Sequence, residues 1–363
     1  MTTKIYFDTQ HLYYLPQYMP VAKQLLSQGC ELKFVLYAKS DQLDIAQNTL
    51  RSNGYEFVVL ADKKDCVNFY QNCGVDWIVF GNVPSFDIKC KAQIPAKMAL
   101  MQHGIGPKAC YYDVSEFPVD VRFVEGQSRL KRLQTRFPHQ QFVDVGFAKL
   151  DPLFSDTQDP LKLTELGLDP NKKTLLYAPT FFPSSIERFS KDWPQLLSDY
   201  NLIIKPHFFS LTKKKYSAHR KLFDSWRQYR NVYIAEGSDF SLVPFIQAAD
   251  LLLSEASSSI FEFVATNKPV VWCDFFKTRW TYGKLLSFRL NRRLDPDMEY
   301  FEKVTRRAKT PNAIKTLIEE ELKNPDRLSV ARQEITKELV GTTDGKCSIR
   351  IANYLLKQAP KTQ

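Results

Sequence analysis

The chain has 363 residues, of which 44% are hydrophobic and 25% are charged. This length favours two domains, and the composition is that of an ordered globular protein. No apolar run approaches the ~20 residues that span a bilayer, and the N-terminus lacks the pattern of a signal peptide. The seven cysteines form no CxxC pair, which favours free, mostly buried thiols over disulfides or a zinc site. We therefore expect a cytoplasmic protein.

The net charge is +10, from 50 Lys and Arg against 40 Asp and Glu. Such a surface favours anionic partners: nucleotides, phosphorylated substrates or anionic lipid. The basic residues are dispersed and no zinc-finger or RNA-recognition signature is present, so nucleic-acid binding is not expected. Peripheral contact with the inner face of the cell membrane fits better, because such enzymes often use basic patches. A solvated basic face without a partner is the alternative.

Short apolar runs alternate with amphipathic segments, which is typical of βαβ units and a parallel sheet. In the first half, several predicted helices stop at a glycine. The helices predicted there include 20–28, 41–53 and 66–73. The strands predicted there are 4–7, 31–36, 56–60, 77–80, 98–102, 121–124 and 141–145.

A polar stretch at 151–172 interrupts this pattern and is interpreted as a linker. A second alternating set follows, so two doubly wound halves facing a cleft are expected, with ligands beyond the carboxyl ends of the strands. The second set of strands is 174–177, 202–205, 231–235, 250–254 and 269–273. The helices predicted after the linker are 193–200, 218–229, 242–249, 258–266, 311–323 and 348–356.

The first candidate site follows a strand, at His103. Gly104 and Gly106 let the backbone turn sharply and approach a ligand closely. A histidine there is suited to taking a proton from a hydroxyl, and Lys108 is placed to meet a phosphate. The alternative is a histidine that only closes the turn.

The second candidate, His207, follows another strand, beside Lys205 and a proline that stiffens the exit. One histidine in each half suits a catalytic base and a donor that stabilises a phosphate; a capped loop histidine is the alternative for His207. His11 follows the first strand and is a candidate for contact with the acceptor. His139 and His219 lie in polar segments and are expected at the surface.

The third candidate is a strand that runs into Ser257, Ser258 and Ser259, where a helix opens. Serines there cap the helix, and the same geometry presents N–H groups and the helix dipole to an anion such as a pyrophosphate. Thr180 ends another strand and is a weaker phosphate candidate. Lys346 lies before the last helix, where a turn and helix cap is the simpler interpretation.

Several catalytic schemes are absent: there is no P-loop, no GxSxG elbow, no GxGxxG fingerprint and no His/Cys metal spacing. No Asp-x-Asp pair of the kind that holds a metal-bound sugar nucleotide occurs either. We therefore expect a metal-independent transfer without a cofactor.

With these segments in view, the chain resembles the CDP-glycerol glycerophosphotransferase family, whose enzymes prime and polymerise teichoic acids and some bacterial capsules. The resemblance runs in order from about residue 100 to the C-terminus. This chain has Glu255 and Ala256 where the family usually has Asp and Tyr, and Phe181 and Phe182 where it often has an arginine. The matching segments are 103–108, 146–151, 176–181, 205–207, 250–269 and 344–346.

The resemblance implies two Rossmann-like domains in the GT-B arrangement, with the C-terminal helix crossing back to the first. Residues 1–155 with helix 346–360 would bind the acceptor, and residues 156–345 the nucleotide donor. The family's two functional histidines map onto His103 and His207, and its serine pair onto Ser257 and Ser258.

The expected reaction moves a glycerophosphate, or a related polyol phosphate, from a CDP-alcohol to a hydroxyl of a lipid-linked or polymeric glycan, with release of CMP. His103 would be the base, and His207 with Lys205 or Lys346 would stabilise the phosphate charge. A glycosyltransferase of the same fold is one alternative, because fold alone does not fix the chemistry. A non-catalytic nucleotide or polyanion binder is the other.

Overall fold

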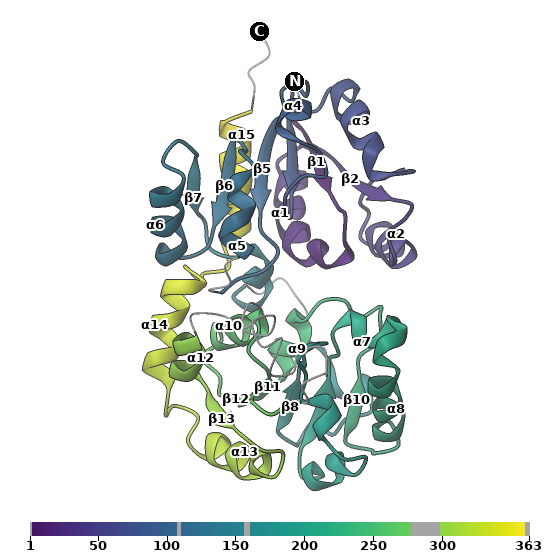
Figure 1. Ribbon diagram of the computed structural model, residues 1–363, viewed down its shortest axis with the longest axis vertical. Coiled ribbons are helices and arrows are strands. Elements are labelled where there is room, and N and C mark those ends of the chain that lie inside the picture. Colours follow the sequence, from purple (N-terminus) through teal and green to yellow (C-terminus); the bar gives the residue numbers. More distant parts are fainter. Residues whose placement is uncertain (1, 107–109, 156–159, 277–297, 360–363) are drawn as a thin grey trace, which may run out of the picture. The chain divides into compact units, whose positions relative to one another are not determined.

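The chain divides into two compact units, each built on its own parallel sheet, which confirms the predicted class of two Rossmann-like α/β domains. The first unit comprises Met1–Ile105, Ala109–Thr157 and Lys337–Gln363; the second comprises Gly106–Lys108 and Gln158–Thr336. The computed structural model describes residues 2–106, 110–155, 160–276 and 298–359 (Figure 1). The candidate Lys108 lies outside the described residues.

The first unit has a seven-stranded sheet in the order β3-β2-β1-β4-β5-β6-β7. All its strand pairs are parallel. Its central strand Trp77–Phe80 is a continuous apolar run buried on both faces, which is the pattern of a parallel sheet between helices. The strands are β1 (Lys4–Asp8), β2 (Glu31–Tyr37), β3 (Phe57–Leu60), β4 (Trp77–Phe80), β5 (Lys97–Met101), β6 (Val121–Val124) and β7 (Phe142–Asp144).

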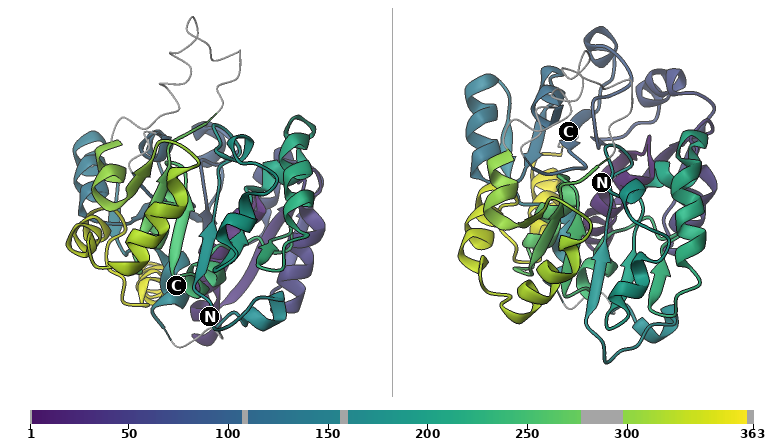
Figure 2. Two further views of the ribbon diagram at one scale, coloured as in Figure 1. Left: turned by 90° about the horizontal axis from the view of Figure 1, so that it is seen from below. Right: turned by 60° about the horizontal axis from the view of Figure 1, so that its bottom comes forward.

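Helices lie on both faces of this sheet (Figure 2). The C-terminal helix α15 (Cys347–Lys357) belongs to this unit: the Trp77 indole donates to the Leu355 carbonyl at 3.0 Å, and Phe123 meets Tyr354 edge-on at 5.4 Å. The return of the last helix to the first domain is thus confirmed. The other helices are α1 (Leu15–Ser27), α2 (Leu43–Ser52), α3 (Cys66–Asn72), α4 (Ile88–Lys91), α5 (Cys110–Asp113) and α6 (Gln127–Arg136).

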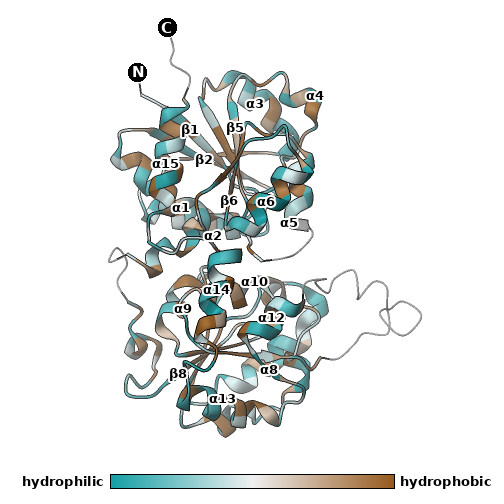
Figure 3. Cartoon of the chain, turned by 90° about the vertical axis from the view of Figure 1, so that its left-hand side faces the viewer, coloured by the Kyte–Doolittle hydropathy of each residue, from teal (hydrophilic) through white to brown (hydrophobic). Residues whose placement is uncertain are grey.

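The second unit has a six-stranded parallel sheet in the order β10-β9-β8-β11-β12-β13. Figure 3 shows β8 in the brown of hydrophobic residues, and β8, β9, β11 and β12 are fully buried. The strands are β8 (Thr174–Tyr177), β9 (Asn201–Ile204), β10 (Val232–Ile234), β11 (Leu251–Ser254), β12 (Val270–Cys273) and β13 (Arg306–Ala308). The helices are α7 (Phe208–Thr212), α8 (Ser217–Trp226), α9 (Val243–Ala248), α10 (Ser258–Val264), α12 (Met298–Val304), α13 (Ala313–Lys323) and α14 (Ser329–Leu339).

The predicted linker, residues 151–172, does not begin at Asp151 as expected. Asp151 is 5% exposed, and its carboxylate accepts from the backbone N–H groups of Cys347 at 3.0 Å and Ser348 at 2.7 Å. It therefore caps the N-terminus of α15. Gly146 faces the same turn, because a Cβ there would lie 2.6 Å from the Cys347 sulfur. The segments 146–151 and 344–346, distant in the sequence, thus meet in a structural joint.

The described helices include none that is both long enough and apolar enough to cross a membrane.

Candidate active site

The candidate residues follow the carboxyl ends of strands at, or next to, the point where the strand order of each sheet reverses. This point lies between β1 and β4 in the first unit and between β8 and β11 in the second. Loops leave neighbouring strands toward opposite faces there, which opens a crevice at the carboxyl ends. His11 follows β1 and His103 follows β5; Thr180 follows β8, His207 follows β9 and Ser257 follows β11. Each unit thus places its candidates at the edge where ligands bind in such sheets.

The His103 ring is oriented by the backbone of the neighbouring strand. Its Nδ1 lies 3.0 Å from the carbonyl oxygen of Gly81. A carbonyl can only accept, so Nδ1 carries the proton and Nε2 is left as the basic nitrogen. Gly104 supports this placement, because a Cβ there would lie 2.3 Å from the Tyr111 hydroxyl and displace that ring. The tautomer is the one a general base requires.

The pKa of His103 is lowered to about 4, chiefly by burial, with the hydrogen bond to Gly81 acting against this and the charges of Lys149 and of protonated His11 adding to it. Desolvation penalises the charged imidazolium, so the ring is neutral at pH 7. His103 can therefore accept a proton across the whole physiological range.

Tyrosine rings surround His103 in the first unit. Tyr14 stacks on it at 5.2 Å between ring centroids, Tyr13 lies at 4.8 Å, and Tyr111 meets it edge-on at 6.2 Å. His11 in turn stacks on Tyr13 at 5.0 Å with 7° between the planes. None of these tyrosines was predicted as a site residue, although a Tyr-Tyr pair just after His11 was the available signal.

In the second unit, His207 is exposed and caps helix α7. Its Nδ1 accepts from the Phe209 N–H at 3.1 Å, so the neutral ring carries its proton on Nε2. The alternative interpretation, a histidine that caps a loop, is therefore correct for the Nδ1 atom of His207. A role for Nε2–H as a donor to an anionic oxygen stays a prediction.

A buried histidine supports α7 from behind. The Ser210 hydroxyl lies 3.1 Å from Nδ1 of His219, and Nε2 of His219 lies 3.2 Å from the Glu187 carboxylate. His219 is 0% exposed, so its prediction as a surface residue is wrong; its polar sequence neighbours concealed a satisfied core position. His139 is exposed, as predicted.

The serine turn after β11 is held by its own hydroxyls. Ser254 donates to the Ala178 carbonyl at 2.7 Å and lies 3.2 Å from Ser257 and 3.1 Å from Ser259. Ser257 is the N-cap residue of α10, yet its side chain makes no capping bond. The Ser258 hydroxyl has no hydrogen-bond partner within the described ranges. The helix start therefore retains N–H groups and a hydroxyl that can meet an anion.

Glu255 ties this turn to the loop after β8. The buried carboxylate accepts from the N–H of Thr180 at 2.6 Å, and from the N–H and hydroxyl of Ser185 at 2.7 and 2.5 Å. Burial raises the pKa of Glu255, which these hydrogen bonds partly offset. The Thr180 hydroxyl donates to the Pro183 carbonyl. Both donors of Thr180 thus hold the loop in place, and its contact with a phosphate stays a prediction.

The two candidate lysines lie in different units. Lys205 is half-buried directly after β9, whereas Lys346 is exposed at the start of α15 in the first unit. The Lys346 N–H donates to the Asp344 carboxylate at 3.0 Å, and Asp344 pairs with Arg350 at 2.8 Å. This segment therefore has the geometry of a turn and helix start, and a phosphate role for either lysine stays a prediction. Across the described part of the chain, no cluster of three or more His, Cys, Asp or Glu could hold a metal ion.

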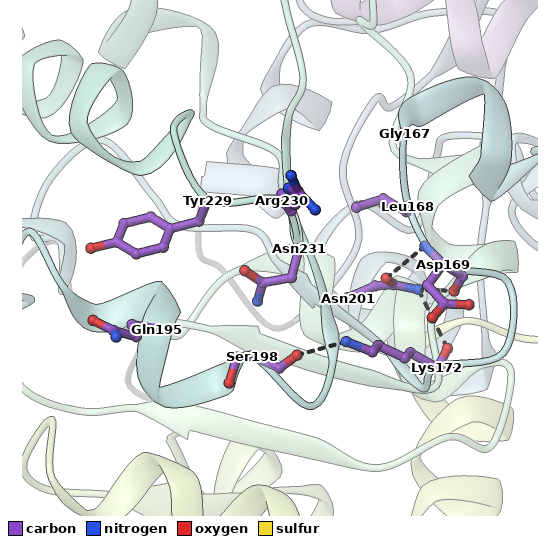
Figure 4. Close-up of a pocket in the computed structure, with 10 residues that line it drawn as sticks. All are labelled: Gly167, Leu168, Asp169, Lys172, Gln195, Ser198, Asn201, Tyr229, Arg230 and Asn231. Atoms are coloured by element: carbon purple, nitrogen blue, oxygen red, sulfur yellow. Dashed lines mark hydrogen bonds between the residues drawn. The ribbon is translucent and has the colours of Figure 1, made fainter.

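A cavity of about 510 Å³ lies at the opposite edge of the second sheet, at the amino ends of its strands (Figure 4). Its polar side chains are used to hold loops: the Lys172 ammonium donates to the Ser198 carbonyl at 2.9 Å, and the Asn201 amide to the Asp169 carbonyl at 2.7 Å. Because ligands of such sheets bind at the carboxyl ends, we do not assign the active site to this cavity.

Comparison with known proteins identifies the family. The family model described as CDP-Glycerol:Poly(glycerophosphate) glycerophosphotransferase matches residues 130–357. The chain is 28% identical over 138 residues to the teichoic acid glycerol-phosphate primase of Bacillus subtilis (strain 168), and 29% identical to that of Bacillus spizizenii. Each match covers 36% of this chain and spans only 33% of the relative's length.

Solved structures share the fold at low identity. A variant of the wall teichoic acid polymerase TagF soaked with CDPG has a TM-score of 0.66 at 14% identity, covering 98% of this chain and 88% of that one. The S. aureus MnaA–UDP structure has a TM-score of 0.60 at 14% identity and covers both chains completely. Because such likeness shows the fold alone, the family model decides the assignment: the chain belongs to the CDP-glycerol:poly(glycerophosphate) glycerophosphotransferase family.

Proposed function

We propose that this protein transfers a glycerophosphate, or a related polyol phosphate, from a CDP-alcohol to a hydroxyl of a lipid-linked or polymeric glycan. Membership of the glycerophosphotransferase family carries this proposal. The likeness to teichoic acid primases and to a polymerase structure obtained with CDPG supports it.

In the proposed reaction, Nε2 of His103 removes the proton from the acceptor hydroxyl. The oxygen attacks the distal phosphorus of the donor in line, the bond between that phosphorus and the bridging oxygen breaks, and CMP leaves. His207 donates from Nε2–H to a phosphate oxygen on which charge develops. Phosphoryl transfer needs little covalent help, so positioning and such donors supply most of the acceleration.

The serine turn of the second unit is the proposed site for the donor pyrophosphate. Its support is the uncapped start of α10 together with the Ser258 hydroxyl. We assign Lys205 and Lys346 to charge stabilisation in the same proposal. A double variant, Ser257→Ala with Ser258→Ala, should raise the KM for the donor at least tenfold while leaving the KM for the acceptor unchanged.

A donor screen tests the proposed function. Purified protein is incubated with CDP-glycerol, CDP-ribitol, and CMP- and UDP-sugars, with and without membrane lipids, and the released nucleotide is identified. The proposal predicts acceptor-dependent CMP from a CDP-alcohol, abolished in His103→Ala. UDP release, or CMP only from a CMP-sugar, would instead establish a glycosyltransferase, and tight binding without turnover a nucleotide binder.

We further propose peripheral contact with an anionic membrane that carries the acceptor. The net charge of +10 supports this, because basic surfaces are attracted to anionic lipid. We expect the protein to co-sediment with phosphatidylglycerol vesicles and not with phosphatidylcholine vesicles. Equal amounts of protein in the two supernatants would exclude a preference for anionic membranes.

A further inference from the structure

The ring pair beside His103 is unusually open to solvent for aromatic side chains in a folded unit. Tyr13 is 45% exposed, and His11, which stacks on it almost parallel, is exposed as well. The side of His11 that packs on the protein is desolvated, which lowers its pKa together with the charge of Lys63 and against the charge of Asp41, so this ring is also neutral at pH 7. The pair is therefore an uncharged aromatic surface directly beside the proposed base.

The neighbouring residue, and not Tyr13 itself, anchors this segment to the core. Tyr14 is 1% exposed and stacks on His103. Gly81 makes room for it, because a Cβ at Gly81 would lie 2.7 Å from the Tyr14 ring. The short helical turn Leu12–Tyr14 thus holds Tyr13 in place, and the part of its ring that His11 and His103 do not contact stays exposed.

Two buried acceptors at the same strand ends lack donors. Asp8 closes β1 and Gln102 directly follows β5; they are 1% and 4% exposed. Oδ1 of Asp8 and Oε1 of Gln102 have no hydrogen-bond partner among the residues that the structure describes. The other carboxylate oxygen of Asp8 accepts from the hydroxyls of Tyr37 and Tyr70, at 2.5 and 2.8 Å. Both oxygens lack solvent-accessible surface, so they belong to the core beneath the ring pair and a ligand does not reach them in this structure.

We propose that His11 and Tyr13 form a platform on which a sugar ring of the acceptor stacks, with its reacting hydroxyl at Nε2 of His103. This inference rests on the proposed function. A pyranose ring has an apolar C–H face that packs on a neutral aromatic ring. A linear glycerol phosphate chain has no such face. The site therefore selects a saccharide end over a polyol phosphate end.

Kinetics with two kinds of synthetic acceptor tests the platform. The full chain and its variants receive CDP-glycerol with octyl disaccharide glycosides or with an octyl oligo(glycerol phosphate). Tyr13→Leu should raise the KM for the glycoside about tenfold, the scale of a lost ring contact, without changing the KM for CDP-glycerol. Tyr13→Trp should restore the glycoside KM to within about threefold. Tyr229→Ala, a tyrosine truncation at the amino-end cavity of the second sheet, is the control and should change neither KM.

Three outcomes would overturn the platform: an unchanged glycoside KM in Tyr13→Leu, an equal rise in the KM for CDP-glycerol, or an oligo(glycerol phosphate) acceptor that is used better than the glycosides. Absence of CMP release from the wild-type protein with every acceptor would count against the proposed function instead. Calorimetric binding of the octyl glycosides then tests the platform by itself. The wild-type chain should bind one of them about ten times more tightly than Tyr13→Leu, and equal affinities would refute the platform.

Discussion

The two strand-end histidines of this protein show how one residue type is prepared for opposite tasks. His103 is half-buried among tyrosines and hydrogen-bonds through Nδ1 to the Gly81 carbonyl. His207 is exposed and accepts through Nδ1 from the Phe209 N–H. The backbone group at Nδ1 decides where the proton resides, so Nε2 is basic in His103 and carries a hydrogen in His207. The first arrangement suits a base, and the second suits a donor to phosphate.

The largest expected effect is at the base. His103→Ala removes the proton acceptor, so kcat for acceptor-dependent CMP release should fall by about 10²–10⁴-fold, the usual range for general base catalysis. The KM for the donor should stay within about threefold of the wild-type value. His139→Ala, at an exposed histidine, is the matched control. A loss of less than tenfold would remove the base role from His103.

A variant of His207 separates its two contacts. In His207→Asn, the amide oxygen can still cap the Phe209 N–H, but the Nε2–H donor is lost. We expect kcat to fall by about 10²–10³-fold, as for other single donors to a developing oxyanion, with an unchanged melting temperature. In His207→Ala, kcat should fall by the same factor, and the free energy of unfolding should also fall by about 1 kcal/mol because the cap is missing. Full activity in the Asn variant would show that His207 acts only as a cap.

A smaller effect is expected from the linkage of Glu255 to pH. Burial raises the pKa of Glu255, so the folded chain binds this proton more tightly than the unfolded chain. The stability it contributes is therefore fully present below the unfolded pKa and is lost as the pH rises through the folded pKa. Relative to Glu255→Gln, the wild-type free energy of unfolding should fall from pH 4 to pH 7, by about 1.4 kcal/mol per unit of pKa difference.

Chemical denaturation at several pH values, followed by tryptophan fluorescence, measures this difference. Glu236→Gln, at an exposed carboxylate 67% accessible to solvent, is the control and should show no such trend. A wild-type protein that gains stability over Glu255→Gln as the pH rises would mean that hydrogen bonding from Thr180 and Ser185 outweighs burial.

The smallest expected effect is in the structural joint of the first unit. Asp151→Ala removes the side-chain cap from α15, which costs about 1 kcal/mol and lowers the melting temperature by about 2–4 °C. Asp151→Asn keeps an acceptor oxygen and should lose less. Activity at low temperature should be unchanged in both variants. A rate loss above tenfold at low temperature would give Asp151 a role beyond this joint.

Most strands could be predicted because a continuous apolar run is a local signal. β4 and β6 are found at the predicted residues, and β8 as well. β13 was missed because Arg306-Arg307-Ala308 is short and polar, and only its pairing with β12 makes it a strand. Helix α1 begins at Leu15 and not at residue 20, because Pro16 lies in its first turn and Pro20 is tolerated inside it.

For the candidate site, the sequence predicts only which residues lie just after strands. The positions of His103 and His207 come from local sequence, but their tautomers depend on Gly81 and Phe209, which the sequence pattern did not connect to them. The Tyr13 and Tyr14 contacts come from a different strand end. Asp151 was interpreted as linker because its partners lie almost two hundred residues away. Long-range contacts of this kind leave no periodic signal.

The most direct test of these opposite histidines is a ¹⁵N NMR titration of the five histidines, assigned with single His→Gln variants. We predict that His103 is protonated on Nδ1 and stays neutral down to about pH 4, since burial lowers its pKa to about 4. His207 should carry its proton on Nε2 at neutral pH. A His103 that carries its proton on Nε2 at neutral pH, or that is already cationic at pH 7, would contradict its assignment as the base.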